Sequence, residues 1–137
     1  MRRWLTPHPN VRAWILLAWW LAMFLLTHLP GIDQWKPKGG WPIKDPDKVI
    51  HFILFGTWSA LWVWFLAGHG QRLNRHVAVC ILLGAAIYAA LDEFTQAPVG
   101  RTPDVFDWIL DTLGCLAGLG VARLLQARYT HHASRIL

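Results

Sequence analysis

Residues 91–114, LDEFTQAPVGRTPDVFDWILDTLG, hold most of the side chains in this chain that could take part in chemistry. Five of the chain's eight acidic residues lie in this segment, beside a glutamine and an arginine: Asp92, Glu93, Gln96, Arg101, Asp104, Asp107 and Asp111. The sequence on both sides is almost entirely apolar. Ionisable groups next to a membrane-length apolar run are costly, so they usually mark a functional site.

Metal binding and structural pairing are two chemistries open to these residues, together with Lys48 and His51 upstream. Histidine and carboxylates bind zinc, and carboxylates with water bind magnesium. Because no closely spaced His-x-x-x-His or Glu-x-x-His pair is present, we predict neither a metal site nor a cofactor. The carboxylates could instead pair with Lys48 and Arg101 and serve only the structure, since partly buried charges need partners.

Headgroup recognition and catalysis are the other two chemistries. Arg101 offers a planar fork for phosphate and Lys48 a point charge, while carboxylates and Gln96 can bind sugar hydroxyls. His51 could act as a general base oriented by Glu93 or Asp92. The motifs contain no Ser or Cys nucleophile, which argues against acyl transfer. We favour binding over catalysis, with a candidate site formed by Lys48, His51, Asp92, Glu93, Gln96, Arg101, Asp104, Asp107 and Asp111.

Four apolar runs must position these residues. The chain is 55% apolar without counting glycine and has ten tryptophans, whereas a soluble domain averages about 45–50% with glycine included. The runs predict helices over residues 11–29, 49–67, 77–96 and 105–125. Each helix, at a rise of ~1.5 Å per residue, approaches the ~30 Å thickness of a bilayer's hydrocarbon core. The predicted fold class is all-α: an integral membrane four-helix bundle forming a single domain over residues 1–137.

The distribution of charge predicts the orientation of the bundle. The net charge of +5 does not indicate nucleic-acid binding, because the arginines lie between apolar runs rather than along one polar face. The termini and the loop over residues 68–76 carry eight basic residues and no acidic one, against five basic residues in the other two loops. The positive-inside rule therefore predicts cytoplasmic termini in a multi-pass membrane protein.

The spacing in the fourth run predicts which residues share a helix face. Asp104, Asp107 and Asp111 follow i, i+3, i+7 spacing, and Gly114 and Gly118 continue that face as Gly-x-x-x-Gly. Small residues let another helix approach closely, so self-association through these glycines is one expectation. We also expect Asp107 to pair with Arg101, and we expect Asp111, the deepest acid, to lack a complete charge partner.

The motifs at the helix ends carry a family resemblance. In chain order they are Asp47-Lys48-x-x-His51-Phe52, Asp92-Glu93-x-x-Gln96, Gly100-Arg101-x-x-Asp104-x-x-Asp107 and Gly114. Together they resemble the VanZ-like membrane protein family over about residues 45–120. The resemblance implies a small multi-span protein of the cell envelope, and its founding member is tied to teicoplanin resistance. Because the candidate site lies at the outer leaflet, we expect membrane lipids, a lipid-linked sugar or a glycopeptide as its partners. The resemblance further implies a place in the bacterial plasma membrane and antibiotic resistance as a role. Asp111 departs from the family, which usually has Asn there.

Overall fold

The computed structural model describes residues 8–29 and 46–133, with side chains up to residue 128. Four α-helices make up this part of the chain, and it contains no β-strand: α1 (Pro9–His28), α2 (Pro46–Gly68), α3 (Arg75–Gln96) and α4 (Val105–Ala133). A short 3-10 helix, η2 (Ala97–Val99), follows α3. The all-α prediction is confirmed.

All four helices are long and apolar enough to cross a membrane. Their outward faces carry many exposed large apolar side chains, among them Trp14, Leu25, Ile87 and Leu124. Such a surface suits lipid better than water. Each helix extends beyond a predicted limit, most of all α2, which begins at Pro46, and α4, which continues to Ala133. Hydropathy marks only the apolar part of a helix, and the hydrogen-bonded backbone continues into the charged residues beyond it.

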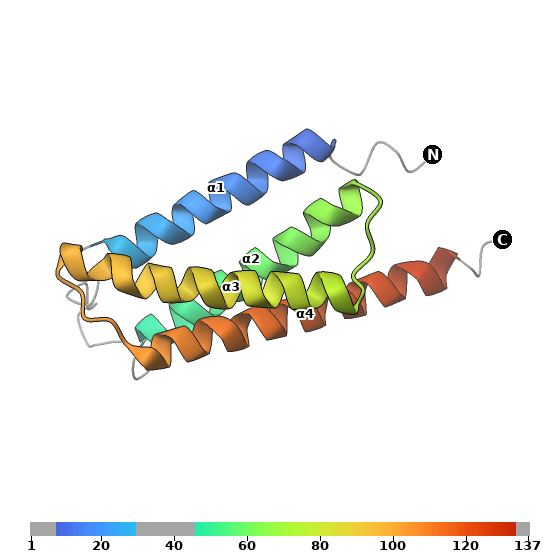
Figure 1. The fold of residues 1–137 in the computed structure, drawn as a ribbon. Helices are drawn as coiled ribbons and strands as arrows, with labels where there is room; N and C mark the ends of the chain where they lie inside the picture. The colour runs from blue at the N-terminus through green and yellow to red at the C-terminus, as the bar shows by residue number, and fades with distance from the viewer. Residues whose placement is uncertain (1–7, 30–45, 134–137) are drawn as a thin grey trace, which may run out of the picture.

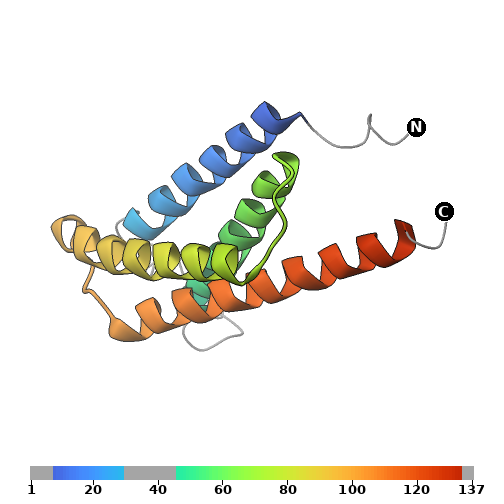
Figure 2. The same ribbon diagram turned by 45° about the vertical axis from the view of Figure 1, so that its right-hand side comes forward.

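The two ends of the bundle differ in what they contain. Figures 1 and 2 show the start of α1 and the end of α4 at one end. The end of α1, the start of α2 and the α3–α4 connection lie at the opposite end. We call this second end the polar end, because the residues singled out by the sequence lie there. Because the described part of the chain runs along the bundle four times, the start of α1 and the end of α4 lie at the same end.

The closest helix contact is between α2 and α4, at glycine residues. A Cβ atom on Gly114 would overlap the Phe52 carbonyl, and one on Gly118 would overlap the Gly56 carbonyl. The Ser59 hydroxyl adds a hydrogen bond to the Cys115 carbonyl at 3.0 Å. The helix that approaches Gly114 and Gly118 is thus α2 of the same chain. This part of the α4 surface is therefore covered within the chain, by α2.

Aromatic side chains fill the space between α1, α2 and α3. Trp58 of α2 packs edge-on to Trp20 of α1, with ring centroids 6.3 Å apart, and stacks on Tyr88 of α3. The Trp19 indole donates a hydrogen bond to the Leu54 carbonyl at 3.2 Å, which ties α1 to α2. On the other side, the Trp108 indole of α4 donates to a backbone carbonyl of α3 at 2.9 Å. These contacts connect all four helices near the middle of the bundle.

Candidate functional site

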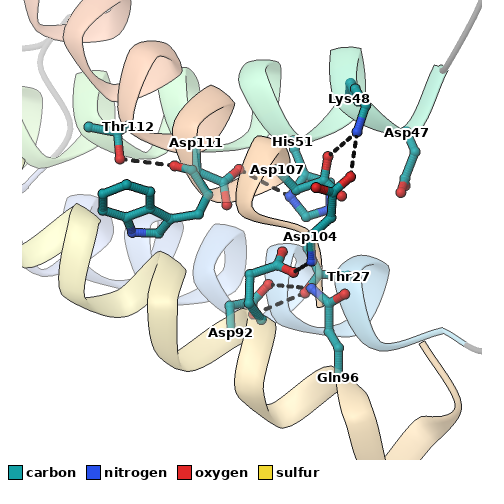
Figure 3. A network of polar contacts seen from close by, with 12 residues as sticks. Thr27, Asp47, Lys48, His51, Asp92, Gln96, Asp104, Asp107, Asp111 and Thr112 are labelled. Atoms are coloured by element: carbon teal, nitrogen blue, oxygen red, sulfur yellow. Dashed lines mark hydrogen bonds and ion pairs between the residues drawn. The ribbon is translucent and has the colours of Figure 1, made fainter. Parts of the chain in front are cut away.

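The polar end cluster is formed by the ends of three helices and the α3–α4 connection. Its members are the nine candidate residues of the sequence and Asp47. Asp47, Lys48 and His51 occupy the first turns of α2, while Asp92, Glu93 and Gln96 end α3. The connection and the start of α4 supply Arg101, Asp104, Asp107 and Asp111. Figure 3 shows most of these side chains pointing into one region.

Lys48 joins α2 to the start of α4. Its Nζ atom lies 2.8 Å from Asp104 Oδ2 and 3.1 Å from Asp107 Oδ1. The hydrogen bond from Lys48, followed by one from the backbone N–H of Phe106, lowers the pKa of the Asp104 carboxyl. The Asp104 side chain also acts as a helix cap, because its Oδ1 accepts that Phe106 N–H at 2.8 Å. A carboxylate is well placed at this positive end of the helix dipole.

Arg101 joins the α3–α4 connection to α1 and α2. Its guanidinium donates from one nitrogen to Asp47 Oδ2 and from another to the Thr27 carbonyl, at 2.8 Å. The expected Arg101–Asp107 pair is therefore wrong, since Asp107 pairs with Lys48. The reason is the turn before Arg101, where Gly100 adopts a left-handed backbone conformation with φ +82°. Asp107 lies in the first turn of α4, on the face toward α2.

Asp92 ties α3 to α1. Its Oδ1 accepts a hydrogen bond from the Thr27 hydroxyl at 3.1 Å, and its Oδ2 accepts one from the Gln96 amide at 3.0 Å. Beside this contact, His28 lies 2.9 Å from the Thr95 hydroxyl. Sequence reasoning missed Thr27, although a lone hydroxyl near the end of an apolar run was a usable signal. With both oxygens engaged, Asp92 does not contact His51 as the orienting acid, which corrects one of the two orienting residues that we expected.

Three buried side chains form what we call the inner triad: His51, Glu93 and Asp111. His51 Nδ1 lies 3.1 Å from Asp111 Oδ1, and the two side chains are 1% and 0% exposed. Glu93 is 6% exposed and accepts the Asp104 backbone N–H through Oε2 at 2.7 Å. The acid that hydrogen-bonds the imidazole is thus Asp111 rather than Glu93 or Asp92. Asp111 has a partner at one oxygen only.

The inner triad keeps hydrogen-bonding capacity that the described part of the chain does not use. His51 Nε2, Glu93 Oε1 and Asp111 Oδ2 are all buried, and none has a hydrogen-bond partner there. One ring nitrogen of His51 and one oxygen from each acid lie within 4.8 Å of one another. A second group of the same kind joins His51 to Asp47 and Asp107, but Arg101 and Lys48 already bind those two acids. Within the polar end cluster, the buried side-chain atoms without a partner are thus those of the inner triad.

The cluster contains more negative than positive charge. Within the polar end cluster, Lys48 and Arg101 are the permanent cations, and they contact three carboxylates, those of Asp47, Asp104 and Asp107. The other carboxylates, on Asp92, Glu93 and Asp111, are buried and meet only uncharged donors or histidine. A buried carboxylate without a cation is expensive unless it gains a proton, a metal ion or a cationic ligand. The arrangement favours groups that donate hydrogen bonds or carry positive charge.

Comparison with known proteins places this site in a family. The family model described as VanZ/LLP1 matches residues 5–126, which include the whole polar end cluster. Neither the curated proteins nor the solved structures gave a significant match. The family match covers most of the chain and agrees with the resemblance carried by the motifs at the helix ends. Its four apolar helices are those of a multi-pass membrane protein. The chain belongs to the VanZ/LLP1 family.

Proposed function

We propose that the polar end cluster binds the headgroup of an envelope lipid, a lipid-linked sugar or a glycopeptide. The observation that supports this most is the set of unpartnered atoms on His51, Glu93 and Asp111. A buried polar atom without a partner costs ~1–3 kcal/mol. Three such atoms on neighbouring side chains are an expensive feature for a purely structural site. A ligand that supplies hydrogen-bond donors offsets this cost.

The position of the cluster suits a ligand with an apolar tail. It lies where the apolar helices end, so a headgroup can enter it while its hydrocarbon chain stays along the exposed apolar faces of the bundle. Lys48 and Asp104 are partly exposed and would form its entrance. Because Arg101 already binds Asp47 and Thr27, its fork is a weaker candidate for direct phosphate recognition than the sequence suggested. Sugar hydroxyls match the acceptor-rich lining better.

For an envelope ligand to reach the cluster, the polar end must face the outside of the cell. We therefore propose that the termini lie in the cytoplasm and the polar end at the external face of the plasma membrane. The excess of arginine around the termini supports this proposal. It is tested by replacing Cys80 and Cys115, introducing a cysteine at the exposed Thr102, and labelling intact cells. A reagent that cannot cross the membrane should label this cysteine. Labelling only after the cells are broken would show that the polar end faces the cytoplasm and would refute the proposed orientation.

The binding proposal is tested on the protein purified in detergent. Native mass spectrometry should detect a retained lipid or lipid-linked sugar, and titration with lipid-linked sugars and teicoplanin should give a dissociation constant. Glu93→Gln removes a charge from the inner triad without changing its shape, and should weaken binding ~10–100-fold, the equivalent of one charged hydrogen bond. His69→Gln, at the opposite end of the bundle, is the control. Equal binding by both variants would refute the proposal.

Glycopeptide tolerance is the cellular form of the same proposal. Expression in a teicoplanin-susceptible bacterium should raise the inhibitory concentration of teicoplanin, and Glu93→Gln should abolish the effect at equal protein level. If the wild-type chain does not change the inhibitory concentration, teicoplanin is excluded as the ligand and an envelope lipid remains the proposed one.

A membrane-embedded enzyme is the second candidate, and the His51–Asp111 pair favours it. A carboxylate at one ring nitrogen orients the imidazole and leaves Nε2 without a partner, which is the arrangement of a general base. The reaction would be hydrolysis of, or transfer from, a lipid headgroup. If the site is catalytic, His51→Gln should abolish product formation while ligand binding persists. Absence of any product from bound lipid phosphates would exclude this function.

A further inference from the structure

We propose that the inner triad binds a divalent transition-metal ion, such as Zn²⁺ or Mn²⁺, to which the phosphate of a lipid headgroup attaches. This inference rests on the proposed function, because it names the partner through which the same cluster would hold a headgroup. We predicted no metal site from the sequence because it contains no closely spaced pair of ligands. Here the three ligands come from α2, α3 and α4 and are far apart in the sequence.

The geometry of the inner triad is close to that of a metal site. Its three ligand atoms lie within 4.8 Å of one another. An ion at the centre of a triangle with that edge would be ~2.8 Å from each atom, whereas Zn–N and Zn–O bonds are ~2.0–2.2 Å long. Each ligand therefore needs to move inward by less than ~1 Å. Glu93 Oε1 and Asp111 Oδ2 have no partner in the described part of the chain, so they can bind an ion without losing a hydrogen bond.

The charge of the inner triad matches a divalent cation. With a neutral imidazole it carries the two carboxylates of Glu93 and Asp111, both buried. Lys48 and Arg101 are bound to other acids and supply no direct ion pair here. One imidazole among carboxylates is the ligand set of zinc or manganese, whereas magnesium and calcium prefer oxygen ligands alone.

The neighbouring contacts would hold the ligands in place. The Asp104 backbone N–H binds the second oxygen of Glu93, and Lys48 binds the Asp104 side chain. Contacts of this kind orient metal ligands in known sites. Three protein ligands leave at least one coordination position open, and a phosphate oxygen can fill it. The ion would thereby let an acid-rich cluster bind an anionic headgroup, which the carboxylates alone would repel.

The test measures metal on the full chain in detergent. After treatment with a chelator, the protein is dialysed against Zn²⁺ or Mn²⁺ alone, and its metal content is measured by mass spectrometry. We expect about one ion per wild-type chain, and a loss of at least ~10-fold in affinity in Glu93→Gln and Asp111→Asn. The matched control is His28→Gln, which changes a histidine at the same end that contacts Thr95 rather than the inner triad. Circular dichroism establishes that each variant is folded.

The outcomes separate the metal from the proposed function. Stoichiometric metal that is lost from Glu93→Gln and kept by His28→Gln supports the inference. A wild-type chain without metal, or equal metal in every variant, overturns it, and the wild-type measurement suffices if Asp111→Asn does not fold. Headgroup binding by metal-stripped protein at full affinity also overturns the inference, but leaves the proposed function intact. If the protein binds metal but no headgroup, the proposed function is overturned, and the only conclusion that stands is that the inner triad binds a metal ion.

Discussion

Arg101 provides the sharpest test of how the polar end is held together. It lies 2.5 Å from Asp47 and donates to the Thr27 carbonyl, so Arg101→Ala breaks one ion pair and one hydrogen bond. Two unit charges at 2.5 Å attract by ~7 kcal/mol at an effective dielectric constant of ~20. The two side chains are 15% and 34% exposed, so water screens the pair and desolvation offsets part of the attraction. The net value should lie between an exposed pair at ~0–1 kcal/mol and a buried one at ~3–5 kcal/mol.

We therefore expect a coupling free energy of ~1–2 kcal/mol between Arg101 and Asp47, and a total cost of ~2–3 kcal/mol for Arg101→Ala, which includes the bond to Thr27. The assay is SDS-induced unfolding in mixed micelles, followed by tryptophan fluorescence. Double-mutant cycles pair Arg101→Ala first with Asp47→Ala and then with Asp107→Ala. The second cycle should give a coupling near zero. A coupling to Asp107 as large as that to Asp47 would refute the pairing described here.

Three further predictions concern other contacts. Thr27→Val removes the donor to Asp92 and should lower the free energy of unfolding by ~1–3 kcal/mol, whereas an unchanged value would mean that this contact is dispensable. The lowered pKa of Asp104 stabilises the fold above the ordinary carboxyl pKa of 3.8, and this contribution is lost as the pH falls through the folded-state pKa. Unfolding measured from pH 6 to pH 3 should thus show a smaller acid-induced loss in Asp104→Asn than in wild type. Gly118→Ala should cost at least ~1–3 kcal/mol or prevent folding, while Gly120→Ala, with open space around it, should be neutral; equal effects would contradict the tight α2–α4 contact.

Most of the fold could be predicted from the sequence because the bilayer imposes a length on each apolar run. The four helices follow from the lengths of the apolar runs. The presence of the charged residues at one end follows from how deep in the bilayer each of them would lie. The i, i+3, i+7 spacing gave the shared face of Asp104, Asp107 and Asp111. It could not give the partners of these acids, because a partner depends on how each helix is rotated about its axis.

The contacts that the sequence did not predict all depend on that rotation or on a turn. The left-handed turn at Gly100 directs Arg101 to Asp47 rather than to Asp107. The rotation of α4 that places Gly114 and Gly118 against α2 also turns Asp111 toward His51. The sequence showed the glycine pattern but contained no information on which helix would cover it.

The contacts of Thr27 have a consequence for how the protein is made. Its two partners outside α1, Asp92 and Arg101, follow it by 65 and 74 residues. When α1 enters the membrane during synthesis, neither partner has left the ribosome. The insertion of α1 must therefore depend on its own hydrophobicity. Its contacts with α3 and the α3–α4 connection form later. A nascent chain that stops before Arg101 would have α1 inserted but not clamped, so it should be the form most exposed to membrane quality-control proteases.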